Sequence, residues 1–203
     1  MAARRGVLLS TPRSFPFFRG NSQCTCRADS GTSLQEVLVC LAIFTTLAAF
    51  STNLYPLVLQ QRMVTQVNQL LGSLHLARSE AIKRGHTVTL CKSANGLYCT
   101  HSSPWEFGWI IFADPNGNRR VDSGDTIIRV AQMEPGVRLS LRASFGHNND
   151  VTYRPGGFTE KNGTFTFCDQ RGTSAARAII LFRTGRPRFS LYSAEGKKLS
   201  CRN

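Results

Sequence analysis

The sequence of 203 residues lacks the common signatures of catalysis. It contains no nucleophile elbow, no phosphate-binding glycine loop and no metal-binding helix motif. His75 falls on the polar side of a predicted helix and His86 falls in a turn, so both are expected to be surface residues and not general bases. We therefore expect a protein that is not an enzyme, and a membrane-tethered enzyme is the least favoured interpretation.

Acidic residues are scarce: the chain has 12 Asp and Glu against 25 Lys and Arg, a formal net charge of +13. The excess is uneven. Residues 32–137 hold eight basic and seven acidic residues, whereas residues 138–203 hold twelve basic and four acidic residues. The C-terminal third is therefore expected to face an anionic partner or acidic neighbours.

The spacing CxxC, which lets two thiolates reach one zinc ion, is absent among the seven cysteines. A zinc site of Cys91, Cys99 and His101 is therefore the less favoured alternative, and we predict no metal or other cofactor. Four cysteines follow the apolar segment described below, and an even number suits disulfides in an oxidising compartment. Three pairings are open, of which we favour Cys91 with Cys99 and Cys168 with Cys201.

No charged residue occurs from Val37 to Gln61. A bilayer requires roughly 20 largely apolar residues in helical form, so this segment is predicted to span a membrane with the arginine-rich N-terminus on the cytoplasmic side. A cleaved secretory signal is the alternative, but its apolar stretch would be shorter, and no small-residue cleavage site follows. We expect residues 32–60 to be retained as an anchor and residues 61–203 to form one exported globular domain.

The helix is predicted to continue beyond the membrane, from Leu34 to Arg84, with a bend near Pro56. Apolar residues recur at spacings of three and four, namely Met63, Val67, Leu70, Leu74, Ala77 and Ala81. The polar side is predicted to hold Gln61, Arg62, Gln66, Gln69, Ser73 and Arg78. Lys83 and Arg84 before Gly85 predict the end of the helix.

Short β-type runs follow Gly85, and none of the gaps between them is long enough for a crossover helix. The predicted strands are Thr87–Cys91, Trp109–Ala113, Ile127–Val130, Val137–Leu141, Thr164–Cys168, Ala178–Phe182 and Pro187–Tyr192. The fold class is therefore α+β, with a long N-terminal helix, half in the membrane and half amphipathic, packed on antiparallel sheet.

The residues before the apolar segment, Gly31-Thr32-Ser33-Leu34-Gln35-Glu36, resemble the prepilin cleavage motif. The resemblance implies that prepilin peptidase removes residues 1–31 as a leader by cutting after Gly31, which makes Thr32 the new N-terminus. It also implies that Glu36, the fifth residue, attracts the amine of a neighbouring subunit during assembly. The alternative is that Glu36 complements the dipole of its own helix.

Three further segments, Leu76–Gly85, Val88–Cys91 and Gly108–Phe112, look like the GspH/FimT family of pseudopilins and minor pilins. The resemblance implies a type IV pilin-like fold and a low-abundance subunit of a type IV pilus in a bacterial inner membrane, with a periplasmic domain. Its partners would be other pilins or pseudopilins of the filament. The alternative is a pseudopilin of a type II secretion system that does not bind DNA.

The segment Asp114–Asp125 places oxygen side chains at positions one, three, five, nine and twelve, as a calcium loop does. The glycine falls at position four, Arg119 stands at position six, and Asp125 replaces the bidentate glutamate. We favour a polar hairpin loop, and predict no metal there.

Basic residues cluster near the C-terminus, namely Arg183, Arg186, Arg188, Lys197, Lys198 and Arg202. In a strand, Arg186 and Arg188 would point to the same face, and Pro187 is best tolerated on an edge. Gly185-Arg186-Pro187-Arg188 matches the GRxR pattern of FimT proteins implicated in DNA binding during uptake, which implies double-stranded DNA as a partner. The alternative is a solvated basic strand, or contacts with acidic neighbours in a filament.

Overall fold

In the computed structural model, the described residues are 33–51, 55–100, 102–143 and 149–201. The predicted leader, residues 1–31, lies outside them, and so does the predicted cleavage position at Gly31 and Thr32. The chain divides into two compact units, with the boundary between Thr46 and Leu47.

The first helix, α1, covers Leu34–Ser51. It begins after Ser33, whose hydroxyl accepts a hydrogen bond from the Glu36 N–H at 3.3 Å. A serine followed three residues later by a glutamate is a common start because it satisfies free N–H groups of the first turn. The predicted continuity from Leu34 to Arg84 depends on residues 52–54, which lie outside the described residues. None of the described helices combines the length and the apolarity that crossing a membrane requires.

The second helix, α2, covers Tyr55–Arg84 and buries the face that the sequence predicts. The buried apolar residues include Met63, Val67, Leu70, Leu74, Ala77 and Ala81. Gln66 and Ser73 are buried as well, so their assignment to the polar side is wrong. The physical reason is that α2 contacts strands of two sheets, which makes its buried stripe wider than the apolar spacing indicates. Ser73 tolerates burial because its hydroxyl donates to the Gln69 carbonyl oxygen at 2.8 Å.

The two ends of α2 follow ordinary helix chemistry. Pro56 lies in the first turn, where its missing N–H has no partner within the helix to lose. Gly85 follows the last residue with φ of 68°, and its N–H donates to the Ala81 carbonyl oxygen at 3.1 Å. Glycine adopts this left-handed conformation without strain, so the predicted end of the helix is confirmed.

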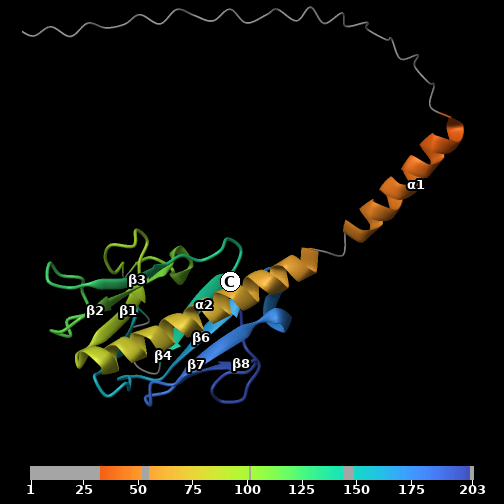
Figure 1. Cartoon of the computed structure of the whole chain (residues 1–203). Coiled ribbons are helices and arrows are strands. Elements are labelled where there is room, and N and C mark those ends of the chain that lie inside the picture. The colour runs from red at the N-terminus through yellow and green to blue at the C-terminus, as the bar shows by residue number, and fades with distance from the viewer. Residues whose placement is uncertain (1–32, 52–54, 101, 144–148, 202–203) are drawn as a thin grey trace, which may run out of the picture. The chain divides into compact units, whose positions relative to one another are not determined.

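The strands of the described residues form two four-stranded antiparallel sheets (Figure 1). The first sheet has the order β3 (Ile127–Ala131), β2 (Trp109–Ala113), β1 (Val88–Lys92) and β5 (Asp150–Tyr153). The second has the order β4 (Arg138–Ala143), β6 (Gly163–Cys168), β7 (Arg177–Leu181) and β8 (Pro187–Ser190). Two short 3-10 helices, η1 (Trp105–Phe107) and η2 (Gly172–Ala175), lie between strands. The α+β fold class is confirmed.

Strand β5 is the element that the sequence does not predict. Its four residues, Asp-Val-Thr-Tyr, show too short an alternation to be distinguished from a loop. It forms because β1 offers it a free edge, with Leu90 opposite Val151 and Val88 opposite Tyr153. The other strands lie within two residues of the predicted ranges.

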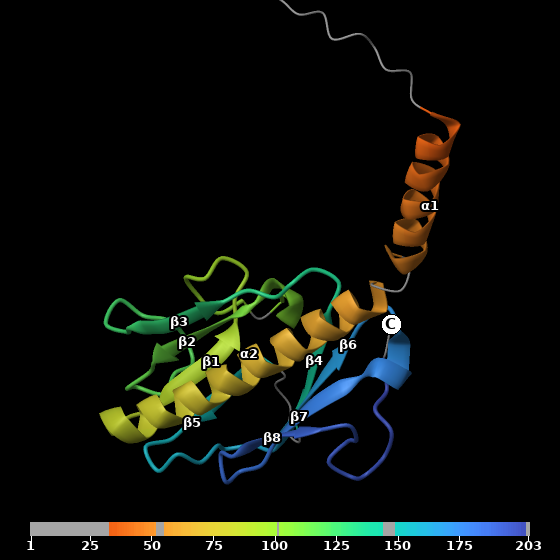
Figure 2. The ribbon, with the colours of Figure 1, turned by 45° about the vertical axis from the view of Figure 1, so that its right-hand side comes forward.

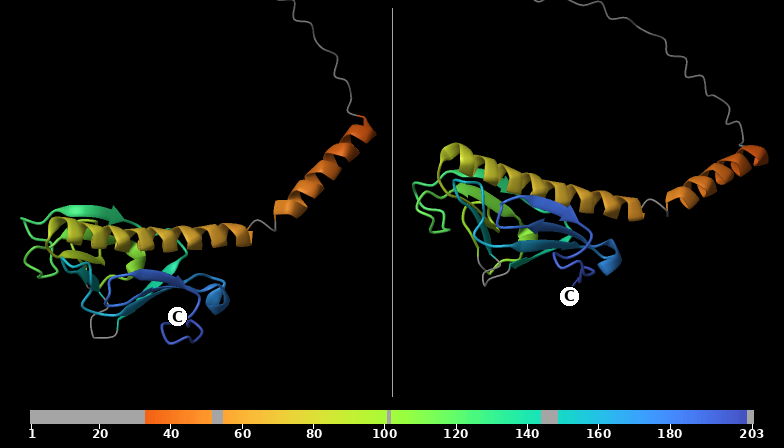
Figure 3. Two further views of the ribbon diagram at one scale, coloured as in Figure 1. Left: turned by 60° about the horizontal axis from the view of Figure 1, so that its bottom comes forward. Right: turned by 90° about the horizontal axis from the view of Figure 1, so that it is seen from below.

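The main core lies between α2 and the sheets, and Figures 2 and 3 show α2 crossing both of them. Its largest fully buried side chains include Trp109, Tyr153, Phe165 and Phe167. The Trp105 ring packs edge-on against Phe165, with ring centroids 5.4 Å apart. Burying each large apolar side chain contributes about 1.5–3 kcal/mol, so this contact area is what holds the helix on the sheets.

Polar contacts also hold α2 to the loop before η2. Arg171 Nη1 donates to Gln60 Oε1 of α2 at 3.0 Å, and Arg171 Nη2 lies 2.5 Å from Asp169 Oδ2. Burial acts to raise the pKa of Asp169, but the hydrogen bonds and positive charge of Arg171 outweigh it, so the pKa is lowered.

The first disulfide joins Cys91 of β1 to Cys99, with a Cα–Cα distance of 5.6 Å. Cys91 packs with Ile110 and Phe112 in a small cluster separate from the main core. The zinc alternative fails for these two residues because their sulfurs are bonded to each other, and His101 lies outside the described residues.

The second disulfide joins Cys168, the last residue of β6, to Cys201, 33 residues further along the chain. Cys168 packs with Leu199, Ala176 and Ala178, so the C-terminal segment is attached to the second sheet by a covalent bond and a small apolar cluster. The structure thus contains both of the favoured pairings.

Candidate nucleic-acid interface

The predicted basic motif lies at the turn between β7 and β8, at the edge of the second sheet. The Gly185 N–H closes this turn by donating to the Phe182 carbonyl oxygen at 2.9 Å. Gly185 has φ of 72°, and a Cβ at this position would lie 2.0 Å from the Gly157 carbonyl oxygen. Glycine is therefore required here both by the backbone conformation and by the close approach of a second loop.

That second loop, residues 154–159, is fixed to the turn by backbone and side-chain hydrogen bonds. The Thr159 N–H donates to the Arg183 carbonyl oxygen at 2.9 Å, and the Thr159 hydroxyl is 3.2 Å from the Phe182 carbonyl oxygen. On its other side, the Gly157 carbonyl oxygen accepts from Arg78 Nε of α2 at 2.8 Å. The turn that carries the motif is therefore held by hydrogen bonds to the loop at residues 154–159, which is itself bonded to α2.

Arg186 and Arg188 flank Pro187, which is buried while both arginines are exposed. Residues two apart in extended backbone point the same way, so this alternation agrees with the expected common face of Arg186 and Arg188. Pro187 opens β8, the edge strand, where its missing N–H costs no sheet hydrogen bond. The Arg188 guanidinium carbon lies 5.4 Å from the centroid of the Phe182 ring, a cation–π contact.

The remaining predicted basic residues lie further along the chain. Lys197 and Lys198 are exposed in a tight hairpin in which the Ser193 N–H donates to the Lys197 carbonyl oxygen at 2.8 Å. Lys197 Nζ is 3.6 Å from Glu195 Oε2, an exposed ion pair that contributes little. Arg202 lies outside the described residues. Arg183 and Arg186 thus lie in the turn between β7 and β8, and Arg188 lies in the first half of β8; residues 183–188 are called the arginine turn below.

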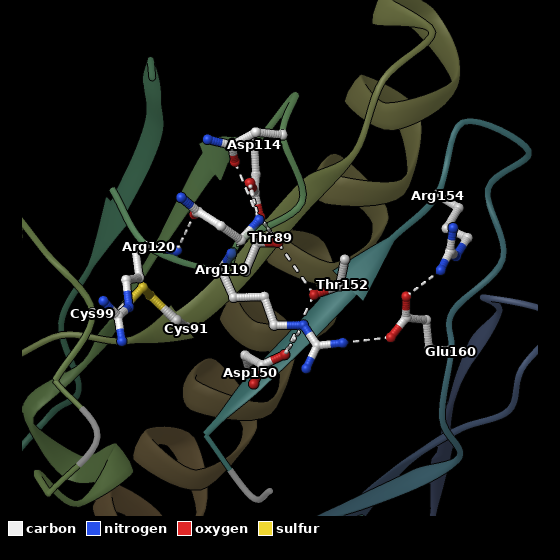
Figure 4. Close-up of polar contacts among 12 residues, drawn as sticks. Thr89, Cys91, Cys99, Asp114, Arg119, Arg120, Asp150, Thr152, Arg154 and Glu160 are labelled. Carbon is white, nitrogen blue, oxygen red and sulfur yellow. Dashed lines mark hydrogen bonds and ion pairs between the residues drawn. A yellow bond between two sulfur atoms is a disulfide. The ribbon is translucent and has the colours of Figure 1, made fainter. Parts of the chain in front are cut away.

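Sequence reasoning missed Arg154, which lies in the loop that packs on this turn. Its Nη2 is 2.5 Å from Glu160 Oε1, and Arg119 Nη2 is 2.5 Å from Glu160 Oε2 (Figure 4). Glu160 is therefore held between two cations, and its negative charge is compensated locally. The turn signal Arg-Pro-Gly-Gly at residues 154–157 could have drawn attention to this loop.

The loop after β2 has a spacing of oxygen side chains that resembles a calcium site. Its first carboxylate, Asp114, accepts hydrogen bonds from the protein itself. Asp114 is fully buried and accepts hydrogen bonds from the Thr89 hydroxyl at 2.8 Å and from the backbone N–H groups of Asn118 and Arg119 at 3.1 and 3.0 Å (Figure 4). Arg119 adopts φ of 63°, which these contacts stabilise.

The second half of the loop is held in the same way. Hydrogen bonds from the side-chain amides of Asn118 and Asn116 lower the pKa of Asp122. Asp125 accepts from the Asp122 N–H at 2.9 Å. Across the part of the chain that the structure describes, no group of three His, Cys, Asp or Glu side chains is placed to hold a metal ion.

His75 and His86, both expected at the surface, do not belong to the turn between β7 and β8. His75 is exposed on α2. His86 is half-buried in the turn after α2, with Nδ1 3.1 Å from the Thr87 carbonyl oxygen.

An amphipathic helix that covers antiparallel sheets, with an apolar helix before it in the chain, is the arrangement that the resemblance to pilins implies. The family model described as type II transport protein GspH matches residues 66–185, more than half of the chain. The chain therefore belongs to the GspH family, the class of minor pilins and pseudopilins that the sequence motifs resemble. A comparison with curated proteins finds no match.

Among solved structures, the fold is similar to the type IV minor pilin FimU of Pseudomonas aeruginosa, with 18% identity, a TM-score of 0.49, and coverage of 66% of this chain and 92% of that chain. It is also similar to the minor pseudopilin EpsH from the type 2 secretion system of Vibrio cholerae, with 10% identity, a TM-score of 0.45, and coverage of 64% and 96%. Both scores are below 0.5, so the family assignment comes from the sequence match.

Proposed function

We propose that this protein is a minor pilin, a structural subunit of a type IV pilus. The observation that carries this proposal is the GspH family match together with the braced arginine turn at the edge of the second sheet. A secretion pseudopilin is the second candidate, and it would not need the arginine turn.

Export and assembly would follow the prepilin route. Cleavage after Gly31 by prepilin peptidase would leave Thr32 as the N-terminus, and mass spectrometry of the membrane-extracted protein tests this. The expected result is a chain that begins at Thr32, and a Gly31→Ala variant that keeps its leader. An intact N-terminus at Met1 in the parent would contradict the proposal.

The apolar residues of α1 support a role as an anchor in the inner membrane and in the filament. Large side chains such as Leu38, Phe44 and Leu47 are more than half exposed in the isolated chain, which leaves a surface for lipid or neighbouring helices to cover. Glu36 would attract the N-terminal amine of a neighbour. Because Ser33 caps α1 independently, Glu36→Gln should leave the helix intact and reduce incorporation into filaments.

The arginine turn is proposed to bind double-stranded DNA through its phosphates. Among the described residues, no acidic side chain forms an ion pair with Arg183, Arg186 or Arg188. Guanidinium groups that are exposed and unpaired suit phosphate contacts, which are sensitive to salt and largely indifferent to base sequence.

The test is an affinity measurement of the full chain in mild detergent with a fluorescent duplex over a range of salt concentrations. Replacing both Arg186 and Arg188 with glutamine should weaken binding for every sequence and reduce the logarithmic salt slope by up to about 2 units. The matched control replaces Arg120 and Arg129, two exposed arginines of the first sheet region, and should leave the slope nearly unchanged.

Two outcomes would contradict DNA binding at this turn. One is a double variant at Arg186 and Arg188 that binds as tightly as the parent. The other is a parent that does not bind DNA even at low salt. Either result would leave the role as a structural subunit standing, with the basic turn serving contacts in the filament or solubility.

A further inference from the structure

A groove lies between the loop at residues 154–159 and the turn between β7 and β8. Its volume is about 480 Å³, which is within the range of small-ligand sites. The lining residues are Arg154, Phe158, Thr159, Glu160, Arg183 and Thr184. The groove therefore borders the arginine turn, and it combines cations, a hydroxyl group and an aromatic ring.

Phe158 is the unusual member of this lining, because its large apolar side chain is 48% exposed on a basic surface. The ring packs over Gly156, where a Cβ would lie 2.4 Å from the ring atom Cε1. This contact places one edge of the ring against the backbone of Gly156. The other aromatic side chain of the turn, Phe182, already has the Arg188 guanidinium over its ring. Phe158 thus presents an aromatic surface that no cation covers among the described residues.

The charged residues of the groove are arranged to favour an anion next to this ring. Arg154 and Arg183 are both exposed. The carboxylate of Glu160 would repel an anion, but it is held by Arg154 and Arg119, each at 2.5 Å. Arg183 uses its backbone to bind Asn162 and Thr159, which leaves its guanidinium group available to a ligand.

We propose that this groove binds one unpaired nucleotide of single-stranded DNA, with its base stacked on Phe158 and its phosphate at Arg183. The inference rests on the proposed DNA binding and deepens it. An aromatic ring beside cations is how proteins bind single strands without sequence preference, since every base has a π-face. In a duplex the bases are stacked on each other and cannot reach the ring. The site therefore favours a single strand or a frayed end.

The test compares one fluorescent oligonucleotide as a single strand and as a duplex, bound to the full chain in detergent at fixed salt. The parent should bind the single strand more tightly. Phe158→Leu should weaken single-strand binding by roughly 5- to 150-fold, the range that loss of one base stack gives, and should leave duplex binding unchanged. Phe158→Tyr should restore single-strand binding, because the tyrosine ring stacks equally well.

Two controls separate stacking from other effects. Phe107→Leu changes another exposed phenylalanine, 57% exposed in η1, and should alter neither affinity. An abasic strand of the same length carries the phosphates without the bases, and it should bind the parent no better than the normal strand binds Phe158→Leu.

The outcomes distinguish this inference from the proposed function. Equal parent affinities for the two forms, tight binding of the abasic strand, or no loss in Phe158→Leu would overturn the nucleotide groove and leave duplex binding at the arginine turn standing. Absence of binding to either form of DNA would overturn both.

Discussion

Removing the disulfide between Cys168 and Cys201 should destabilise the protein more than removing the one between Cys91 and Cys99. The residues of the two pairs are 33 and 8 apart along the chain, and loop-closure entropy for these separations gives about 3.7 and about 2.5 kcal/mol. The longer loop also carries Leu199, which is 6% exposed and packs beside Cys168. Release of the C-terminal segment would expose that contact as well.

The assay is thermal and urea unfolding of two double variants, each with both cysteines of one pair replaced by serine. Trp105 and Trp109 are buried, so tryptophan fluorescence reports the opening of the core. For a chain of this size each kcal/mol shifts Tm by about 2–4 °C, so we expect a loss of about 7–15 °C for the pair Cys168 and Cys201 and a smaller loss for the other.

The order of the two losses tests the reasoning. A reductant added to the parent opens both disulfides, so it should lower Tm by at least as much as removing the pair Cys168 and Cys201 does. If the variant of Cys91 and Cys99 proved the less stable of the two, or if the variant of Cys168 and Cys201 unfolded like the parent, loop length would not explain the stabilisation.

Three further changes probe the scaffold by urea unfolding. Gly185→Ala should lower the free energy of unfolding by about 2 kcal/mol or more, because the left-handed backbone and the close carbonyl oxygen both oppose a Cβ. Gly196 has φ of 75° and no atom within 4 Å of an added Cβ, so Gly196→Ala should lower it by only about 1 kcal/mol. Equal losses would refute the close approach at Gly185. Asp114→Ala should lower the free energy of unfolding by about 3 kcal/mol or more, since three donors lose a buried acceptor. A loss below about 1 kcal/mol would refute the role of Asp114 as a structural acceptor. The pKa of Asp169 is lowered in the folded protein, so its stabilisation is fully present above its unfolded pKa of about 4 and is lost as the pH falls through the folded value. The difference in free energy of unfolding between the parent and Asp169→Asn should therefore shrink in acid. A difference that stays constant with pH would contradict this.

Local patterns in the sequence were enough to predict the elements whose signals are short-range. The spacing of apolar residues in α2 and the alternation in strands such as β2 depend only on neighbours along the chain. The end of α2 at Gly85 depends on one residue that tolerates positive φ. The same holds for the arginine turn, where Arg186 and Arg188 share a face because they are two residues apart.

Tertiary structure alone decided the features that depend on residues far apart in the chain. Strand β5 exists because the edge of β1 pairs with it, although residues 150–153 have no strong preference of their own. Gln66 is buried because two sheets meet under α2, and Asp114 is a structural acceptor because Thr89 and the turn backbone converge on it. The groove at Phe158 forms only where residues 154–160 meet residues 183–184, and no spacing along the sequence encodes that meeting. Sequence periodicity reports the neighbours of a residue along the chain, whereas pairing and packing across the fold are set by the free energy of the whole chain.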